Sequence, residues 1–170
     1  MLNKIPVPLL IRDLLLITLT LGLWWASRSL GEARTPDAIG IAIAAGVMTA
    51  LSGYLVHEWG HLIGARLAHA VVELPRTPLA VFLFKFDVVR NSRRQFLWMS
   101  MGGFVASAVV VALLLAVLSL DRLADQVALG LTAAGVLATA VLELPPAWRV
   151  YRGGELPSGV AFVGVPPPGR

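Results

Sequence analysis

Long stretches without a charged residue constrain this chain more than any other feature. Such runs cover residues 14–27, 38–56, 95–120 and 126–142. A helix needs about 20 mostly apolar residues to cross the hydrocarbon core of a bilayer, so the second and third runs are long enough as they stand. The first and fourth runs need flanking residues to complete a span. Only 14% of the chain is charged, against about a quarter in a soluble domain. We therefore predict transmembrane helices over about residues 14–31, 38–66, 95–120 and 125–144.

The first run has two interpretations. Lys4 and Arg12 precede its apolar core, as basic residues precede the core of a secretory signal peptide. Trp24 and Trp25, however, stand where a cleavage site needs small residues. We favour a retained membrane anchor and keep cleavage of the first run as the alternative.

The distribution of lysine and arginine predicts the orientation. With four spans, the amino terminus, the loop 66–94 and the carboxyl tail share one side of the membrane. Of the 14 lysines and arginines, all except Arg28, Arg34 and Arg122 lie on that side. This asymmetry predicts a multi-pass protein of a bacterial plasma membrane with both termini in the cytoplasm. We therefore attribute the net charge of +4 to the membrane topology and to contact with the lipid bilayer. We expect no nucleic-acid partner.

The second run leads directly into the sequence His57-Glu58-Trp59-Gly60-His61. On a helix, positions i and i+4 share a face, so His57 and His61 can direct two imidazoles at one cation. Two neutral imidazoles suit Zn²⁺, and Glu58 can reach a water at its open coordination position as general base. The chain contains no cysteine, so a cysteine-based metal site is excluded. Leu67 replaces the third histidine of the metzincin pattern, and we expect His69 to be a surface residue.

HEWGH on a transmembrane helix, followed by "SMGGFVASAVVVALL" on the next span, resembles the site-2 protease family of intramembrane zinc metalloproteases. Gly102, Gly103 and Ser107 stand near the position of that family's Gly-Pro-x-x-Asn-like segment, without its proline and asparagine. The resemblance implies an all-α membrane protein, a four-transmembrane-helix bundle of site-2 protease type. It also implies Zn²⁺ as cofactor and a transmembrane protein as substrate.

In the family, the third zinc ligand is the aspartate of a later Asn-x-x-Pro-x-x-x-x-Asp-Gly-like motif, and this chain has no Asp-Gly. Glu143-Leu144-Pro145 resembles the leading end of that motif. Glu143 is the first candidate for a replacement ligand, because it lies at a depth in its span similar to that of His57. Glu155, in "GELPSG", is the second candidate and requires the tail to fold back into the membrane. A carboxylate at a helix end that reaches toward water is the alternative role of Glu143.

The segment between the second and third spans contains a period-two alternation. Phe82, Phe84, Phe86 and Val88 alternate with Val81, Leu83, Lys85 and Asp87, which predicts a short cytoplasmic β-hairpin or strand. Such a strand either pairs with unwound substrate or only caps the bundle, and we expect Asp87 to be a surface charge.

Small residues at four-residue spacing, such as Gly60 with Gly64 and Gly102 with Ala106, predict close helix packing. The proline-rich tail, about residues 160–170, is predicted to be disordered. We expect residues 1–170 to form a single membrane-embedded, metalloprotease-like domain without a PDZ-sized insertion.

Two functions follow. The first is a zinc metalloendopeptidase that hydrolyses a peptide bond in or near a transmembrane segment. His57 and His61 would be its ligands, Glu58 its base, and Glu143 or Glu155 its third ligand. The second is a non-proteolytic relative that binds metal or a membrane partner without cleavage, which the missing Asp-Gly favours.

The basic asymmetry gives a direct test of topology. A reporter fused after Arg170 should be cytoplasmic, and a reporter inserted near Glu32 should lie on the opposite side of the membrane. Compartment-specific reporter activity measures both positions. Two reporters on the same side would contradict the four-span arrangement, and a processed amino terminus would favour the signal-peptide interpretation.

Overall fold

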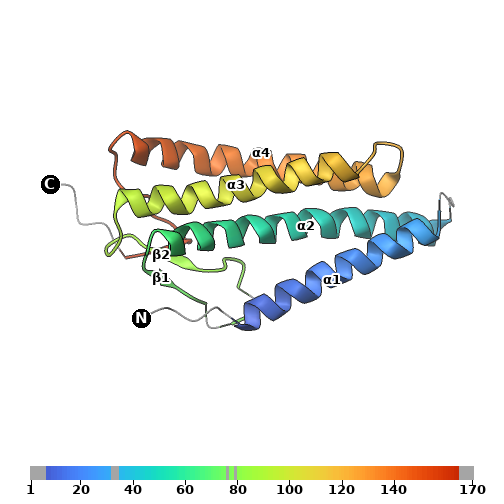
Figure 1. Cartoon of the computed structure of the whole chain (residues 1–170), viewed down its shortest axis with the longest axis horizontal. Helices are drawn as coiled ribbons and strands as arrows, with labels where there is room; N and C mark the ends of the chain where they lie inside the picture. The colour runs from blue at the N-terminus through green and yellow to red at the C-terminus, as the bar shows by residue number, and fades with distance from the viewer. Residues whose placement is uncertain (1–6, 32–34, 76, 79, 165–170) are drawn as a thin grey trace. The chain divides into compact units, whose positions relative to one another are not determined.

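The computed structural model describes residues 7–31, 35–75, 77–78 and 80–164. It is mostly helical, with a small sheet (Figure 1). The helices are α1 (Val7–Ser29), α2 (Pro36–Leu67), α3 (Arg93–Val117) and α4 (Leu123–Tyr151). The strands are β1 (Val72–Glu73), β2 (Lys85–Asp87) and β3 (Phe162–Val163).

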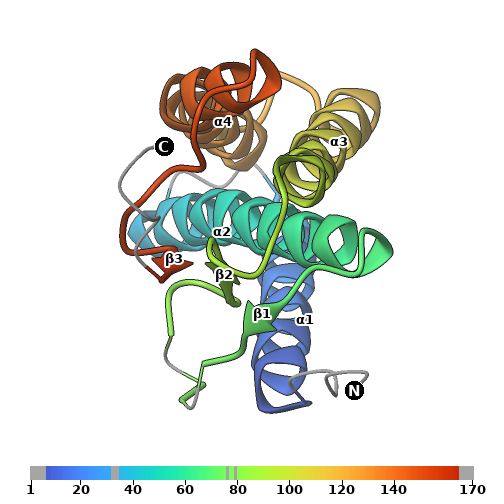
Figure 2. The same cartoon turned by 90° about the vertical axis from the view of Figure 1, so that its left-hand side faces the viewer.

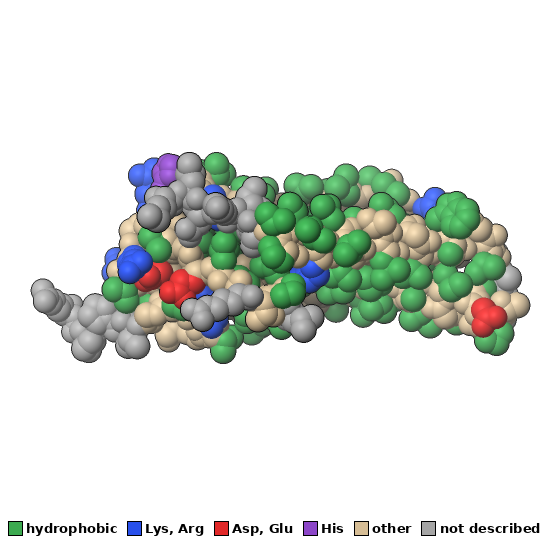
Figure 3. Space-filling model, turned by 90° about the horizontal axis from the view of Figure 1, so that it is seen from below, with side chains coloured by type: hydrophobic (Ala, Val, Ile, Leu, Met, Phe, Trp, Pro, Cys, Tyr) green, Lys and Arg blue, Asp and Glu red, His purple; other side chains and the backbone are tan. Residues whose placement is uncertain are grey.

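All four helices are long and apolar enough to cross a membrane. Few of the residues in each span are buried, and large apolar side chains such as Leu21, Leu113 and Val141 are more than half exposed. Hydrophobic side chains cover much of the helical surface visible in Figure 3. Such an apolar surface is favourable in contact with lipid and unfavourable in contact with water. The four helices therefore indicate an integral membrane protein in a bilayer, as the uncharged runs predicted.

The helices extend beyond the predicted spans at two informative places. Helix α1 begins at Val7 and includes Arg12 and Asp13, whose side chains form an ion pair at 2.7 Å. Helix α4 continues through Pro145 and Pro146. Each proline removes one backbone hydrogen bond, but the buried side chains of Ala147 and Val150 hold the last turns in place.

The structure divides into two compact units, and helices α2, α3 and α4 each contribute a segment to both. Unit 1 comprises Met1–Val56 and Ser107–Leu137, and unit 2 comprises His57–Ala106 and Ala138–Arg170.

Unit 1 is held together by small residues and hydroxyl groups. Ala42, Ala45 and Ala124 form a core cluster, against which Leu23 and Trp24 pack. The indole N–H of Trp24 donates to Thr49 Oγ1 at 2.6 Å, and the hydroxyls of Thr20 and Ser52 are hydrogen-bonded at 2.9 Å. Such bonds satisfy polar groups that lipid would leave without a partner.

In unit 2, glycines bring α2 and α3 into backbone contact. A Cβ added at Gly60 would lie 2.5 Å from the carbonyl oxygen of Gly102 and from Ala106 Cβ. A Cβ at Gly64 would meet the carbonyl of Trp98. The predicted small-residue packing is thus present where α2 carries the histidines. Gly130, in unit 1, has no such neighbour within 4 Å.

The sheet of unit 2 lies beside the end of α2 (Figure 2). Its strand order is β1-β2-β3, with β1 antiparallel and β3 parallel to β2. The predicted alternation holds at Lys85, which is exposed, and at Phe86, which is buried. Asp87 corrects the expectation of a surface charge. It is buried because its carboxylate accepts hydrogen bonds from the N–H groups of Val89 and Arg90 and closes the turn after β2.

The tail is a second correction. Residues 160–170 were predicted to be disordered, yet Phe162 and Val163 form strand β3. The ring of Phe162 packs on Phe86 and Phe96 at 6.5 and 6.2 Å between ring centroids, which anchors the tail to the sheet and to α3. Residues 165–170 lie outside the described part of the chain.

Candidate metal centre

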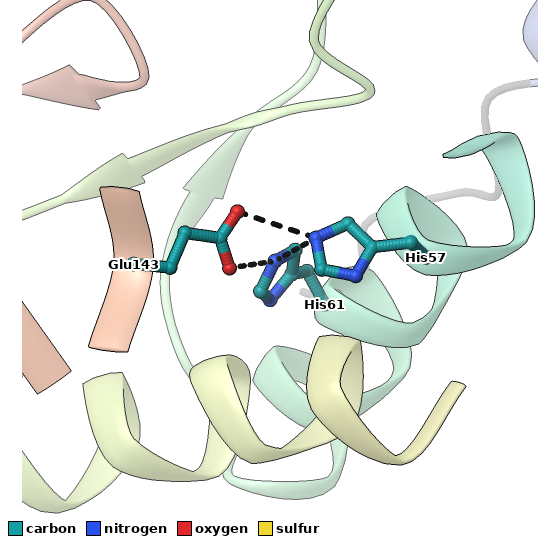
Figure 4. A group of neighbouring side chains, drawn as sticks. All are labelled: His57, His61 and Glu143. Atoms are coloured by element: carbon teal, nitrogen blue, oxygen red, sulfur yellow. Dashed lines mark hydrogen bonds and ion pairs between the residues drawn. The ribbon is translucent and has the colours of Figure 1, made fainter. Parts of the chain in front are cut away.

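His57 and His61 project from α2 toward Glu143 on α4 (Figure 4). All three belong to unit 2. The Nε2 atoms of the two histidines are 2.9 Å apart. Oε1 of Glu143 lies 3.2 Å from His57 Nε2, and Oε2 lies 3.2 Å from His61 Nε2. One donor atom from each of the three residues therefore lies within 4.8 Å of the other two, although His57 and Glu143 are 86 positions apart in the chain.

Helix α3 orients both imidazoles. Nδ1–H of His57 donates to the carbonyl of Gly103 at 3.0 Å, and Nδ1–H of His61 donates to the carbonyl of Met99 at 2.9 Å. A carbonyl oxygen only accepts, so the proton of each neutral ring is on Nδ1 and the lone pair is on Nε2. Metal-binding histidines are commonly fixed in this way. The absence of a side chain at Gly103 is required here, because a Cβ would lie 2.5 Å from His61 Nε2.

With both rings neutral, the arrangement favours a cation at its centre, either a proton on one Nε2 or a metal ion. Two Nε2 lone pairs and a carboxylate face one another at distances at which they repel. His57 and His61 are almost fully buried, and Oε2 of Glu143 is buried without a hydrogen-bond donor in the described part of the chain. Donors about 2.0–2.1 Å from a tetrahedral ion lie about 3.3 Å from each other. The observed separations of 2.9–3.2 Å are close to that value. The group of His57, His61 and Glu143 can therefore hold a metal ion.

Glu58 lies next to this group without belonging to it. Its carboxylate accepts a long hydrogen bond, 3.4 Å, from the backbone N–H of Leu83, and only 8% of the residue is exposed. Glu58, His61 and Glu143 line one cavity of about 270 Å³ in unit 2. A carboxylate and two of the three donors thus face a common space.

The rest of the cavity wall is mostly apolar. It comes from the segment before β2, from α3, from α4 and from the tail: Phe82, Phe84, Phe96, Met99, Ser100, Leu142, Pro146, Pro157, Ala161 and Phe162. A tail that folds back was considered only as a source of Glu155 as a ligand, and its contribution of Pro157, Ala161 and Phe162 to the cavity wall was not predicted. The role of the Met99 and Gly103 carbonyls was not predicted either. Every residue has a backbone carbonyl, so the sequence does not show which ones accept hydrogen bonds from the histidines.

The structure separates the two candidates for a third ligand. Glu143 approaches both histidines, whereas Glu155 is exposed and is absent from the donor group in the described residues. His69 is exposed as well, in a left-handed conformation just after α2. Ligation of a metal by Glu143 stays a prediction.

The segment that was predicted to pair with an unwound substrate does not offer a free strand edge at β2. Strand β2 is central in the sheet, because β1 pairs along one side and β3 along the other. It has no free edge, so any added strand would have to pair with β1 or β3 or replace one of them.

Comparison of the chain with protein-family models, with curated proteins and with solved structures gives no match.

The geometry predicts which carboxylate holds the metal. Glu143→Gln keeps the size of the side chain and removes a charged donor, so it should weaken zinc binding by more than about 100-fold. That is the upper end of the loss seen when a residue that only orients a ligand is changed. Glu155→Gln is the matched control and should leave the affinity unchanged. Zinc content after dialysis against a competing chelator measures both. Loss of zinc in Glu155→Gln alone would transfer the role to the tail.

Proposed function

We propose that this chain is an intramembrane zinc metalloprotease that hydrolyses a peptide bond in or near a transmembrane segment of another protein. The observation that carries the proposal is the common cavity of Glu58, His61 and Glu143. A site that only binds metal has no use for a buried carboxylate beside the donors. A hydrolase requires one.

Two imidazoles and one carboxylate with a further position open form one of the ligand sets of catalytic zinc, and zinc is the metal of this proposal. When bound, it polarises the carbonyl of the scissile bond and acidifies a water at its open position. His57, His61 and Glu143 would hold it, and the carbonyls of Met99 and Gly103 would keep the two rings aligned.

Glu58 performs the proton transfers in this proposal. Its carboxylate accepts a proton from the attacking water as the water oxygen bonds to the carbonyl carbon. It then delivers that proton to the nitrogen as the C–N bond breaks, so the products are a carboxylic acid and an amine. The N–H of Leu83 holds Oε2 in place.

The walls of the cavity suit an unwound apolar segment. A helical substrate hides its carbonyls in internal hydrogen bonds, so the chain must be extended before attack. Pro145 and Pro146 cannot donate to the carbonyls of Val141 and Leu142, their partners one turn earlier in α4. Leu142 lines the cavity, so in this proposal its carbonyl pairs with an N–H of the extended substrate. The outer edge of β3 supplies further backbone groups.

One feature of the sequence favours a second function. The chain lacks the Asp-Gly of the family that HEWGH resembles, as expected of a relative that binds metal or a membrane partner without cleavage. The buried Glu58 opposes this alternative, because binding alone does not explain it.

Glu58→Gln separates the two functions. It should retain zinc, because no donor is removed, and should lower kcat by at least about 100-fold, because the general base is lost. The measurement is cleavage of a panel of tagged single-span membrane proteins in detergent micelles, with zinc content determined in parallel. Glu155→Gln is the matched control and should cleave like the wild type.

Two outcomes would contradict the proposal. Cleavage by Glu58→Gln at the wild-type rate would exclude the proposed base. A wild-type protein that binds stoichiometric zinc and cleaves none of the panel would favour the non-proteolytic alternative.

A further inference from the structure

A second hollow of unit 2 lies between α3 and α4. This α3–α4 groove has a volume of about 410 Å³ and a mostly apolar lining: Arg94, Leu97, Trp98, Ser100, Met101, Phe104, Ala147 and Tyr151. It shares only Ser100 with the cavity at the histidines. Trp98, Met101 and Tyr151 are about half exposed or more. The groove is thus an open apolar channel, separate from the metal donors.

Arginines lie at one end of the same two helices. Arg93 and Arg94 begin α3, and Arg149 and Arg152 lie at the end of α4. The two ends meet, since a Cβ added at Gly153 would be 3.6 Å from Arg93 Nη1. Among the described residues, the arginines that form an ion pair with a carboxylate are Arg12 and Arg90. No carboxylate of the described residues therefore forms an ion pair with the four arginines at this end.

Aromatic rings mark the level of the membrane surface at this end. The Arg152 guanidinium lies 4.7 Å from the centroid of the Trp148 ring, and Trp148 stacks on Tyr151 at 5.6 Å. Tryptophan and tyrosine gather where hydrocarbon meets lipid headgroups. An acyl chain in the groove would therefore place its headgroup at the arginines.

The simpler explanations of these arginines are incomplete. Positive charge at the end of α4 is favoured by the helix dipole, which accounts for Arg149 and Arg152. The same dipole disfavours Arg93 and Arg94 in the first turn of α3. The positive-inside rule requires basic residues on the cytoplasmic side, but it does not require an apolar groove that ends among them.

We propose that the α3–α4 groove binds one anionic phospholipid, with an acyl chain along Leu97, Met101 and Phe104 and the phosphate at Arg94 and Arg152. Arginine recognises phosphate through parallel N–H···O bonds, and basic pockets between transmembrane helices are typical sites for anionic headgroups. A zwitterionic lipid fits less well, because its own cation would meet arginines that form no ion pair with a carboxylate of the described residues. This site is independent of the proposed protease activity.

Native mass spectrometry of the full chain in detergent tests the proposal. The probes are phosphatidylglycerol and phosphatidylcholine with identical acyl chains. The wild type should retain one phosphatidylglycerol at least about 10-fold more tightly than phosphatidylcholine. Arg94→Gln and Arg152→Gln should each weaken phosphatidylglycerol about five-fold. Arg90→Gln is the control, since it removes a charge that is paired with Asp87 outside the groove.

Tryptophan fluorescence tests the position of the acyl chain. Brominated phosphatidylglycerol should quench the emission of Trp98, and the quenched component should be missing in Trp98→Phe. The quenching should fall in the double variant Arg94→Gln/Arg152→Gln and persist in Arg90→Gln.

Three results would overturn the proposal. The first is equal retention of the two lipids by the wild type. The second is the same loss of phosphatidylglycerol in Arg90→Gln as in Arg94→Gln. The third is a dimer without retained lipid that dissociates in Trp98→Ala, which would assign the groove to a second copy of the chain.

Discussion

The candidate site depends on two hydrogen bonds from imidazole N–H groups to the backbone of α3. In a bilayer, an unpaired polar group costs several kcal/mol, on the order of the stability of a small domain. The carbonyls of Gly103 and Met99 remove that cost for one nitrogen of His57 and one of His61. The close approach at Gly60, Gly102 and Gly103 brings these carbonyls within reach. The close contact between α2 and α3 therefore both packs the two helices and supplies the hydrogen-bond acceptors of the two histidines.

Once the Nδ1 protons are committed to α3, the remaining nitrogens have few options. Their lone pairs face each other and the carboxylate of Glu143, at 2.9–3.2 Å. A bound metal ion would convert these donors into ligands, and its binding energy would offset the cost of placing ionisable groups in the membrane. Shared ligation of one ion would account for the close grouping of two histidines and a glutamate in a chain that is poor in charge. Glu143 on α4 would supply the carboxylate of that ligand set.

Much of this arrangement follows from sequence, and the remainder does not for identifiable reasons. The uncharged runs predicted the four apolar helices, and the i, i+4 spacing put His57 and His61 on one face of α2. Depth in the fourth run placed Glu143 near them. The helix through Pro145 and Pro146, the burial of Asp87 and strand β3 were missed. Strand β3 depends on the contact of Phe162 with the distant Phe86, which local propensity does not encode. Asp87 is buried through a local turn, in which its carboxylate accepts from the N–H groups of Val89 and Arg90, and the alternation pattern does not show that turn.

The central claim is that His57, His61 and Glu143 bind one zinc ion, and X-ray absorption at the zinc edge tests it most directly. The purified chain in detergent should show two imidazole nitrogens and at least one oxygen at about 2.0–2.2 Å. In His57→Ala, the scattering from a second imidazole should disappear from whatever zinc remains. A protein that takes up no zinc, or whose zinc shell contains no imidazole, would contradict the account.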